Sequence, residues 1–320
     1  MSTPHDALFK AVFSEPDKAA SALKAVMPPR LADAVHWPGL ALCPGSFVDD
    51  QLRSQHTDLL FSTIWSDGSD RQLYLLFEHQ SSSDADMPLR LLRYQVRIWE
   101  RWRADHPERK RLPAVIPVVL YHGATSWAAP RSFVTALDLP PELLELASPY
   151  VVQFSYLFDD LSDISDDALR KQARDPLVLL AKVCLARASS SDPVAMLHDY
   201  IDVVRAVAAG PDGLKALARV MRYIAEVSTR VDLDALSSFL ILAAGPAAKD
   251  AIMTLAEEWR QEGRQQALQE TLLLVLRQKF GKAVDANVEQ RITVASADQL
   301  GSWVARVVGA ATLADVINHA

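Results

Sequence analysis

Two acidic side chains that could share a metal ion stand in neighbouring strand-like segments. Asp58 lies at the start of one apolar run, and Glu78 lies near the end of the next. The dipeptide Asp67-Gly68 between them is a strong hairpin signal. A chain reversal there places Asp58 opposite Phe77 or Glu78, so we expect the two carboxylates to be neighbours. Carboxylates this close repel each other unless a cation lies between them, and such oxygen ligands suit Mg²⁺ or Mn²⁺.

An amide side chain follows Glu78 by two positions. Because side chains alternate between the faces of a strand, Gln80 is predicted to project beside Glu78, roughly 6.6 Å further along, whereas His79 points away. A second interpretation is a solvated strand end, with Asp58 at a terminus and residues 78–80 forming a polar edge before a serine loop. The spacing alone leaves both interpretations open.

Five separated segments in the first 123 residues carry a family resemblance. In chain order they are His5–Lys10, Thr57–Phe61, Phe77–Ser82, Met87–Tyr94 and Pro117–Gly123. Together they resemble the Rpn family of recombination-promoting nucleases, also described as transposases, within the PD-(D/E)XK nuclease superfamily. The resemblance implies an α/β (α+β) restriction-endonuclease-like core, with a mixed central sheet flanked by helices. It also implies a Mg²⁺-dependent DNA endonuclease.

The same resemblance assigns roles to residues. Asp58 and Glu78 would be the acidic pair that holds Mg²⁺ or Mn²⁺, with the backbone carbonyl of His79 as a third ligand, and a metal-activated water would hydrolyse the phosphodiester. Gln80 stands where the superfamily has lysine. Glutamine at this position is the form usual in the Rpn family. An amide can only orient that water, so we expect slow chemistry. An inactive nuclease fold that binds DNA or protein is the alternative, and a general-base enzyme using His122 or His79 is a weaker one.

Residues from about 88 to 104 are predicted to form a helix with one basic face. Its arginines recur at helical spacing and would form a DNA-binding strip: Arg90, Arg93, Arg97 and Arg101. Residues 88–111 hold eight basic and three acidic side chains in a chain of net charge −7, and this contrast favours a nucleic-acid contact over a merely solvated face. Gln95 lies within the apolar face and needs a partner, either the metal site or the backbone.

The elements around this helix follow from apolar periodicity and turn residues. Residues 5–27 predict one or two helices with a break at Ser14-Glu15-Pro16, and Asp6 there either supports the site or is an ordinary surface residue. A loop with short helical turns is expected over 124–149. Strands are predicted near residues 46–53, 57–65, 72–80, 113–121 and 150–157.

From about residue 162 the chain is predicted to be all-helical. The expected helices are near 166–188, 195–209, 211–227, 232–244 and 250–280, followed by three short ones. The last part resembles a small domain of unknown function often appended to Rpn-type proteins. The predicted domains are therefore a nuclease-like domain, 1–160, a helical extension, 161–248, and a small helical domain, 249–320, whose long amphipathic helix could join a homodimer.

Whole-chain composition bounds these interpretations. A length of 320 residues with 50% hydrophobic content is enough for a sizeable core and more than one domain. No signal peptide or membrane span is recognised, and Cys43 and Cys184 lack metal-ligand spacing, so we expect free thiols in the cytoplasm. The acidic balance argues against a general DNA coat, so any DNA contact should be local.

Overall fold

A computed structural model describes residues 3–44, 59–187, 192–228, 232–281, 284–307 and 309–317. The chain divides into two compact units, Met1–Pro246 and Ala247–Ala320. The strand predicted near 46–53 and the predicted ligand Asp58 lie outside the described residues. The three-domain division at residues 160 and 248 stays a prediction.

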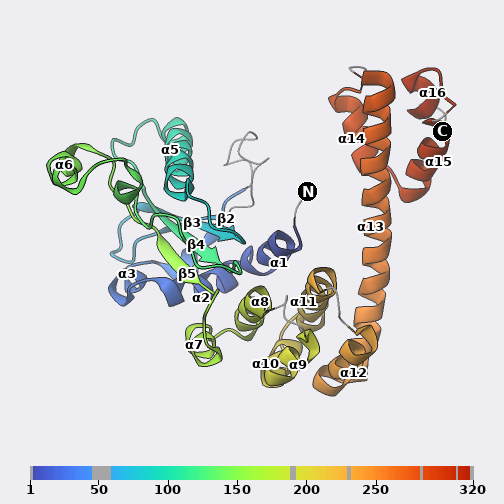
Figure 1. The fold of residues 1–320 in the computed structure, drawn as a ribbon, viewed down its shortest axis with the longest axis horizontal. Helices are drawn as coiled ribbons and strands as arrows, with labels where there is room; N and C mark the ends of the chain where they lie inside the picture. Colours follow the sequence, from blue (N-terminus) through green and yellow to red (C-terminus); the bar gives the residue numbers. More distant parts are fainter. Residues whose placement is uncertain are drawn as a thin grey trace. The chain divides into compact units, whose positions relative to one another are not determined.

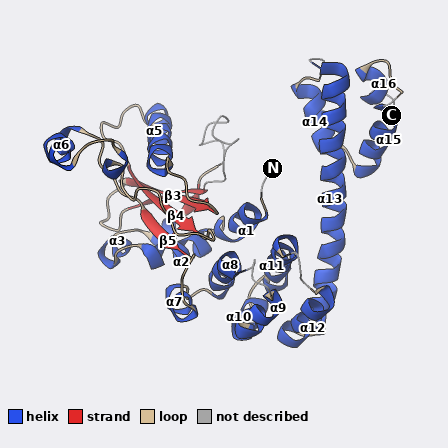
Figure 2. Ribbon diagram, viewed as in Figure 1, coloured by secondary structure: helices blue, strands red, loops and turns tan. Residues whose placement is uncertain are grey.

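A mixed five-stranded sheet forms the centre of the first unit (Figures 1 and 2). Its order is β1-β2-β3-β4-β5, with antiparallel pairing from β1 to β3 and parallel pairing from β3 to β5. The strands are β1 (Ala41–Leu42), β2 (Leu59–Ile64), β3 (Gln72–Gln80), β4 (Ala114–Tyr121) and β5 (Leu157–Asp160). The predicted mixed α/β architecture is confirmed.

The β2–β3 hairpin turns at the predicted dipeptide. Gly68 has a φ of 77°, a left-handed conformation that costs glycine little. The Asp67 carboxylate accepts hydrogen bonds from the backbone N–H of Ser69 at 3.0 Å and from its hydroxyl at 2.6 Å, which fixes the turn. The resulting register pairs Leu59 with Phe77, so the end of β3 lies beside the start of β2.

Helices cover both faces of the sheet (Figure 1). On one face α5 (Met87–Asp105) buries the predicted apolar stripe, including Leu91, Ile98 and Trp102, against the sheet. On the other, α1 (Pro4–Phe13) places Phe9 edge-on to Phe77 of β3, with ring centroids 5.0 Å apart. These apolar contacts hold one helix on each side of the end of β3.

The amino-terminal helices match the predicted break. The Thr3 hydroxyl accepts from the Asp6 N–H and the Asp6 carboxylate accepts from the Thr3 N–H, which is a capping box for α1. Pro16 then begins α2 (Pro16–Val26), which is followed by α3 (Pro29–Asp33) and the 3₁₀ turn η1 (Trp37–Gly39).

The predicted strand at 150–157 is wrong over most of its length. Residues Ser148–Tyr150 form the 3₁₀ turn η4, and β5 begins only at Leu157. Tyr150 is 89% exposed and Val152 is 44% exposed, so their apolar character does not mark a core strand. The preceding loop holds short helical elements as predicted, namely η3 (Val134–Ala136) and α6 (Pro141–Ala147).

Two predicted helices are each divided in two. Pro176 lacks a backbone N–H, so the helix expected at 166–188 becomes α7 (Asp166–Gln172) and α8 (Pro176–Arg187). The helix expected at 195–209 is interrupted at Tyr200 into α9 (Pro193–Asp199) and α10 (Ile201–Ala208). The next two, α11 (Gly213–Val227) and α12 (Leu233–Ala244), lie where predicted.

The second unit is built on the long predicted helix. Its elements are α13 (Pro246–Phe280), α14 (Ala286–Val294), α15 (Ala297–Val307) and α16 (Leu313–Ile317). Leu272 and Leu276 of α13 pack in one core with Ile292, Leu300 and Trp303 of the short helices. Gly281 follows α13 with a φ of 54°, as expected for a glycine helix stop.

No helix in the described part of the chain has the length and apolar character needed to cross a membrane.

A buried ion pair joins β5 to α8. Lys182 Nζ lies 2.6 Å from Asp159 Oδ2, and the two side chains are 0% and 1% exposed. Neither side chain makes a well-aligned hydrogen bond to a described residue, so the contact is an electrostatic one. Two charges removed from water in this way depend on each other.

We predict that Lys182→Ala lowers the free energy of unfolding by about 3–5 kcal/mol, because it leaves a buried carboxylate without a counter-charge. Urea unfolding followed by circular dichroism measures the loss. The double variant Lys182→Met with Asp159→Leu should recover most of it, since no charge then remains buried. Lys215→Ala removes an ion pair whose side chains are 68% and 78% exposed, and should cost under about 1 kcal/mol. An equally small cost for Lys182→Ala would contradict the electrostatic role.

Candidate functional site at the end of the third strand

The last three residues of β3 bury polar side chains. Glu78 is 0% exposed, and His79 and Gln80 are each 6% exposed. They pair in register with Val119–Tyr121 of the parallel strand β4. These side chains have therefore exchanged water for protein partners, although Asp58, the expected solvated terminus of the second interpretation, lies outside the described residues.

Glu78 is the most constrained of the three. Its Oε1 accepts hydrogen bonds from Arg90 Nη2 and from Gln80 Nε2, the latter at 2.7 Å. Arg90 lies in the first turn of α5, and its Nη1 also donates to Asp84 Oδ2 at 3.1 Å. The other carboxylate oxygen of Glu78 is buried and has no hydrogen-bond partner among the described residues. One guanidinium therefore neutralises a wholly buried carboxylate and leaves one of its oxygens unused.

The Gln80 amide brings two of the predicted metal ligands together. Gln80 Nε2 lies 2.7 Å from Glu78 Oε1 and 2.6 Å from the backbone carbonyl of His79. Both neighbours are acceptors, so the nitrogen of the amide must face them. Two oxygens of the kind that Mg²⁺ and Mn²⁺ prefer thus converge on one point. The oxygens are of the type that suits a hard cation, and the Gln80 amide nitrogen occupies the point where they meet in this structure.

His79 points to the opposite face of the strand, as predicted. Its Nδ1 lies 3.3 Å from Asp6 Oδ1 of α1, and its ring is stacked against Phe9 and His122, with centroids 5.0 and 4.8 Å away. The hydrogen bond with His79 is the main reason that the pKa of Asp6 is well below its usual range. Asp6, for which support of the site was one of two predictions, therefore anchors the end of β3 to α1.

Two further histidines extend this stack. His5 lies 4.7 Å from His122, centroid to centroid, and its Nδ1 is 2.8 Å from the Tyr223 hydroxyl of α11. Burial, followed by the charges of His79 and His5, lowers the pKa of His122 to about 3. So weak a base does not suit general-base catalysis at neutral pH, and this argues against that role for His122.

A pocket of about 370 Å³ opens at this end of the sheet. Asp6, His79 and Gln80 line it from one side, and Asp84 and Arg90 line it from the other, with the serine loop 81–83 between them. The loop is tied down because Ser83 Oγ accepts from the backbone N–H groups of residues 128 and 129, at 3.0 and 3.2 Å. The pocket is thus a preformed polar site between α1 and α5.

The predicted arginine strip separates into two environments. Arg90 is 13% exposed and faces Glu78. Arg93, Arg97 and Arg101 are exposed, and the last two form ion pairs with Glu100 at 3.2 Å and Asp105 at 2.8 Å. The DNA-binding role of the four residues stays a prediction.

The Gln95 side chain has a backbone partner, which was one of the two predicted alternatives. It is 4% exposed, and its Nε2 donates to the Leu91 carbonyl at 3.4 Å, one turn earlier in α5. No contact with the pocket residues is seen for it in the described ranges, and its support of the site stays a prediction.

The metal itself also stays a prediction. In the part of the chain that the structure describes, no group of three or more His, Cys, Asp or Glu side chains is arranged to hold an ion. Asp58, the second expected carboxylate, lies outside that part, although the next residue, Leu59, pairs with Phe77 beside Glu78.

Sequence reasoning missed two partners in this region. Asp84 was not singled out, because its role depends on a guanidinium that reaches it from α5. The Asp159–Lys182 pair was also missed, although a lysine inside the apolar run of α8 was a signal that a buried counter-charge exists. The predicted free thiols are confirmed for Cys43 and Cys184.

A mixed sheet flanked by helices, with a buried carboxylate and an amide at the end of a central strand, defines a nuclease-like α/β protein. Residues 3–215 match the family described as "Putative transposase, YhgA-like". The chain therefore belongs to this family, which includes the Rpn proteins. No solved structure is significantly similar to it.

Three relatives show how far the similarity extends. Recombination-promoting nuclease RpnD of Escherichia coli O157:H7 is 41% identical over 125 residues, which is 39% of this chain and 47% of that protein. Recombination-promoting nuclease RpnA of Escherichia coli K12 is 29% identical over 82% of this chain and 86% of its own length. The inactive recombination-promoting nuclease-like protein RpnE of the same strain is 29% identical over 84% and 85%.

The histidine stack predicts a loss of stability in mild acid. Between pH 6.5, the ordinary pKa of histidine, and pH 3, the unfolded chain binds a proton at His122 that the folded chain does not bind. Stability should therefore fall as the pH falls, by about 2 kcal/mol at pH 5 for this residue. In His122→Phe, urea unfolding at pH 7.5 and pH 5 should show a pH difference smaller by that amount. His198→Gln, which changes an exposed histidine on α9, should leave the difference unchanged; the same difference in wild type and His122→Phe would rule out this role.

Proposed function

We propose that this protein is a metal-dependent DNA endonuclease of the recombination-promoting type. The observation that carries the proposal is the convergence of Glu78 Oε1 and the His79 carbonyl on one point, beside a buried carboxylate oxygen that has no partner among the described residues. The names of RpnD and RpnA support a nuclease activity for the family. The choice of metal and of DNA as substrate belongs to this proposal.

The residues that would hold Mg²⁺ or Mn²⁺ are Glu78, the backbone carbonyl of His79, and Asp58. When bound, such an ion would act as a Lewis acid that lowers the pKa of the attacking water and offsets negative charge on the phosphate. Gln80 keeps its amide at the ligands in this structure, and a rotation of that side chain lets it orient the attacking water by hydrogen bonding. Arg90 presents a guanidinium to the pocket, and such a group stabilises negative charge on non-bridging phosphate oxygens.

The exposed arginines of α5 would carry the DNA contact next to this pocket. Arg93, Arg97 and Arg101 lie beyond Arg90 on the same helix, and phosphate contacts from such residues position a nucleic acid without reading its sequence. The acidic character of the whole chain keeps this contact local. The proposal also places the enzyme in the cytoplasm, as a homodimer joined through the helices of the second unit. Light scattering at several protein concentrations tests the dimer.

A catalytically weak or inactive protein that binds DNA or another protein is the second candidate. Arg90 already neutralises Glu78 in this structure, so a cation must compete with a buried guanidinium for the same carboxylate. Gln80 adds no charge to activate water, and the relative RpnE carries the name of an inactive protein. These three observations are compatible with a site that has kept its shape but lost its activity.

We predict that Asp58→Ala and Glu78→Ala each abolish the nicking of supercoiled plasmid in Mg²⁺, with a loss of at least about 10³-fold, because each removes a charged ligand of the ion. Glu78→Ala also leaves Arg90 without its main partner, so Glu78→Gln serves as a variant of similar volume, and circular dichroism verifies folding. Glu226→Ala removes an exposed carboxylate of α11 and should nick at the wild-type rate.

The two candidates give different results in this assay. Wild-type nicking that stops in EDTA supports the nuclease. Nicking that continues in EDTA overturns the metal role, and a folded Glu78→Gln that nicks at the wild-type rate overturns the site. Absence of nicking in Mg²⁺ and in Mn²⁺, with DNA binding retained, would establish the second candidate.

The basic face of α5 makes its own prediction. Replacement of Arg93, Arg97 and Arg101 by alanine should weaken binding of a 20-base-pair duplex and reduce the slope of log K against log salt by about 0.9 for each phosphate that the variant no longer binds. Fluorescence anisotropy at several salt concentrations measures both. The triple variant Arg30→Ala, Arg205→Ala and Arg219→Ala removes the same charge from other elements and should keep the wild-type slope. An unchanged slope in the α5 variant would mean that this face is only solvated.

A further inference from the structure

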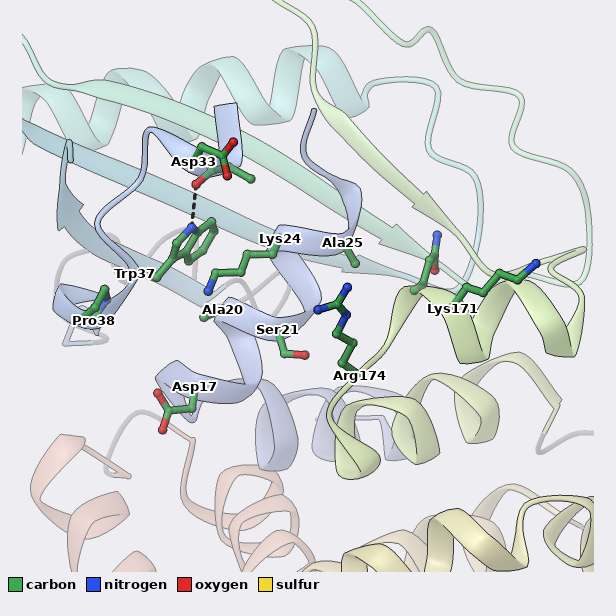
Figure 3. Close-up of a pocket in the computed structure, with 12 residues that line it drawn as sticks. Asp17, Ala20, Ser21, Lys24, Ala25, Asp33, Trp37, Pro38, Lys171 and Arg174 are labelled. Atoms are coloured by element: carbon green, nitrogen blue, oxygen red, sulfur yellow. Dashed lines mark hydrogen bonds between the residues drawn. The ribbon is translucent and has the colours of Figure 1, made fainter. Parts of the chain in front are cut away.

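A second and larger pocket lies on the first unit, away from the residues of the candidate site. Its volume is about 1150 Å³, above the ~300–1,000 Å³ usual for small-molecule sites. Its walls come from α2, from the α3–η1 segment and from the end of α7 (Figure 3). None of its lining residues takes part in the Glu78 network.

Basic side chains from two separate elements meet in this pocket. Lys24 comes from α2, and Lys171 and Arg174 come from the end of α7 and the residues after it. All three are exposed, and none forms an ion pair with a described residue. Figure 3 shows Lys24 and Arg174 extending into the same space, with Lys171 at the rim. Cations that share a concave surface and form no ion pair favour an anionic ligand.

The pocket also contains two carboxylates, Asp17 and Asp33. In Figure 3 Asp33 lies above the end of the Lys24 side chain and Asp17 lies below it. With three cations and two carboxylates the lining carries a small positive charge in a chain whose net charge is −7. This charge pattern fits an extended anion that follows the cations better than it fits a compact, highly charged one.

A rigid aromatic wall stands beside the cations. Trp37 Nε1 donates to the Ala32 carbonyl at 2.8 Å, which fixes the indole, and Lys24 Nζ lies 5.0 Å from the ring centroid. A ring already held in place loses little entropy when a flat group stacks on it. An aromatic ring next to basic residues is the combination by which proteins bind single-stranded nucleic acid, with bases on the ring and phosphates on the cations.

The pocket wall also contains a hydrogen-bond acceptor without a donor in the described part of the chain. Gln172 Oε1 is buried in the pocket wall and accepts no hydrogen bond from the described residues. Such an acceptor calls for a ligand with N–H or O–H donors, which nucleobases have and bare phosphate chains lack. The ligand chemistry is therefore anionic, flat and donor-bearing.

The walls of the pocket are held in place before any ligand binds. Lys18 of α2 forms an ion pair with Asp175 at 2.7 Å, which joins α2 to the α7–α8 connection. Asp175 Oδ1 also accepts from the Leu177 and Val178 N–H groups, at 2.9 and 3.1 Å, so the residue next to Arg174 is fixed by the start of α8. The cations on both walls thus face a preformed opening.

We propose that this pocket binds a segment of single-stranded nucleic acid, with phosphates on Lys24 and Arg174 and one unstacked base against Trp37. The proposal rests on the proposed nuclease function, because it supplies a second contact for the strand that such an enzyme acts on. A base paired within a duplex cannot reach the indole and the Gln172 acceptor, so the pocket should prefer single strands.

Fluorescence anisotropy with a fluorescein-labelled 20-nucleotide oligothymidine tests this proposal in the full-length protein. EDTA in the buffer keeps cleavage out of the measurement. The double variant Lys24→Ala with Arg174→Ala should bind about tenfold more weakly at 100 mM salt, and the salt slope should fall by about 1.4, or ~0.7 for each single-strand phosphate that is no longer bound. The matched control, Lys215→Ala with Arg219→Ala on α11, should bind like wild type.

The base contact has a separate measurement. Trp37→Leu should weaken oligothymidine binding about tenfold, Trp37→Phe should recover part of it, and neither should affect an abasic oligomer of the same length. Circular dichroism verifies that both variants fold. Binding of a 20-base-pair duplex should change less than threefold in all of them. An equal loss for duplex DNA in any of these variants, or for abasic DNA in the Trp37 variants, would overturn the single-strand assignment. Wild-type affinity in the Lys24/Arg174 variant would overturn the pocket.

Failure of this proposal is distinguishable from failure of the nuclease function. Plasmid nicking by a protein whose Lys24/Arg174 variant binds like wild type would remove the pocket and keep the nuclease. Weakened binding in that variant, in a protein that never nicks DNA, would keep the pocket and remove the nuclease.

Discussion

Burial of the Glu78 carboxylate is the constraint on which the rest of the site depends. A charged carboxylate with no exposure to solvent costs several kcal/mol unless a counter-charge and hydrogen bonds accompany it. Arg90 provides the charge from α5, and Gln80 provides a hydrogen bond from the same strand. The loop between β3 and α5 must therefore be short and well held, and the Ser83 and Asp84 contacts hold it. Each of these contacts also makes a wall of the pocket.

The helices on the two faces of the sheet bring side chains of opposite type to the end of β3. On the α5 face an arginine meets the buried glutamate, while on the α1 face a carboxylate, Asp6, meets His79. Alternation of side chains along the strand separates these two contacts, although Glu78 and His79 are adjacent in sequence. The backbone carbonyl of His79 is consequently fixed from both sides, by its ring on one face and by the Gln80 amide on the other. This fixed position is what the proposed role of the carbonyl as a metal ligand requires.

The site holds the features of an active nuclease and of an inactive one. Its oxygens converge as those of a metal site do, yet the positive charge beside them comes from a protein group. Under the proposed function, activity would depend on whether a divalent ion outcompetes a guanidinium that is itself held by a second carboxylate, Asp84. The second pocket, as proposed, binds a nucleic-acid strand whether or not a divalent ion displaces the guanidinium.

Local sequence determined the elements and the face that each residue takes. The Asp67-Gly68 turn, the alternation along β3, the apolar stripe of α5 and the glycine after α13 all depend on residues close together in the chain, and all were predicted. The errors were local too: Pro176 and Tyr200 divided two helices, and an exposed apolar run was mistaken for a strand. Tertiary structure alone decided the partners. Three contacts join residues that lie between 12 and 73 positions apart in the chain: Arg90 with Glu78, Asp6 with His79, and Lys182 with Asp159. No short-range sequence pattern encodes which distant charge will neutralise a buried one.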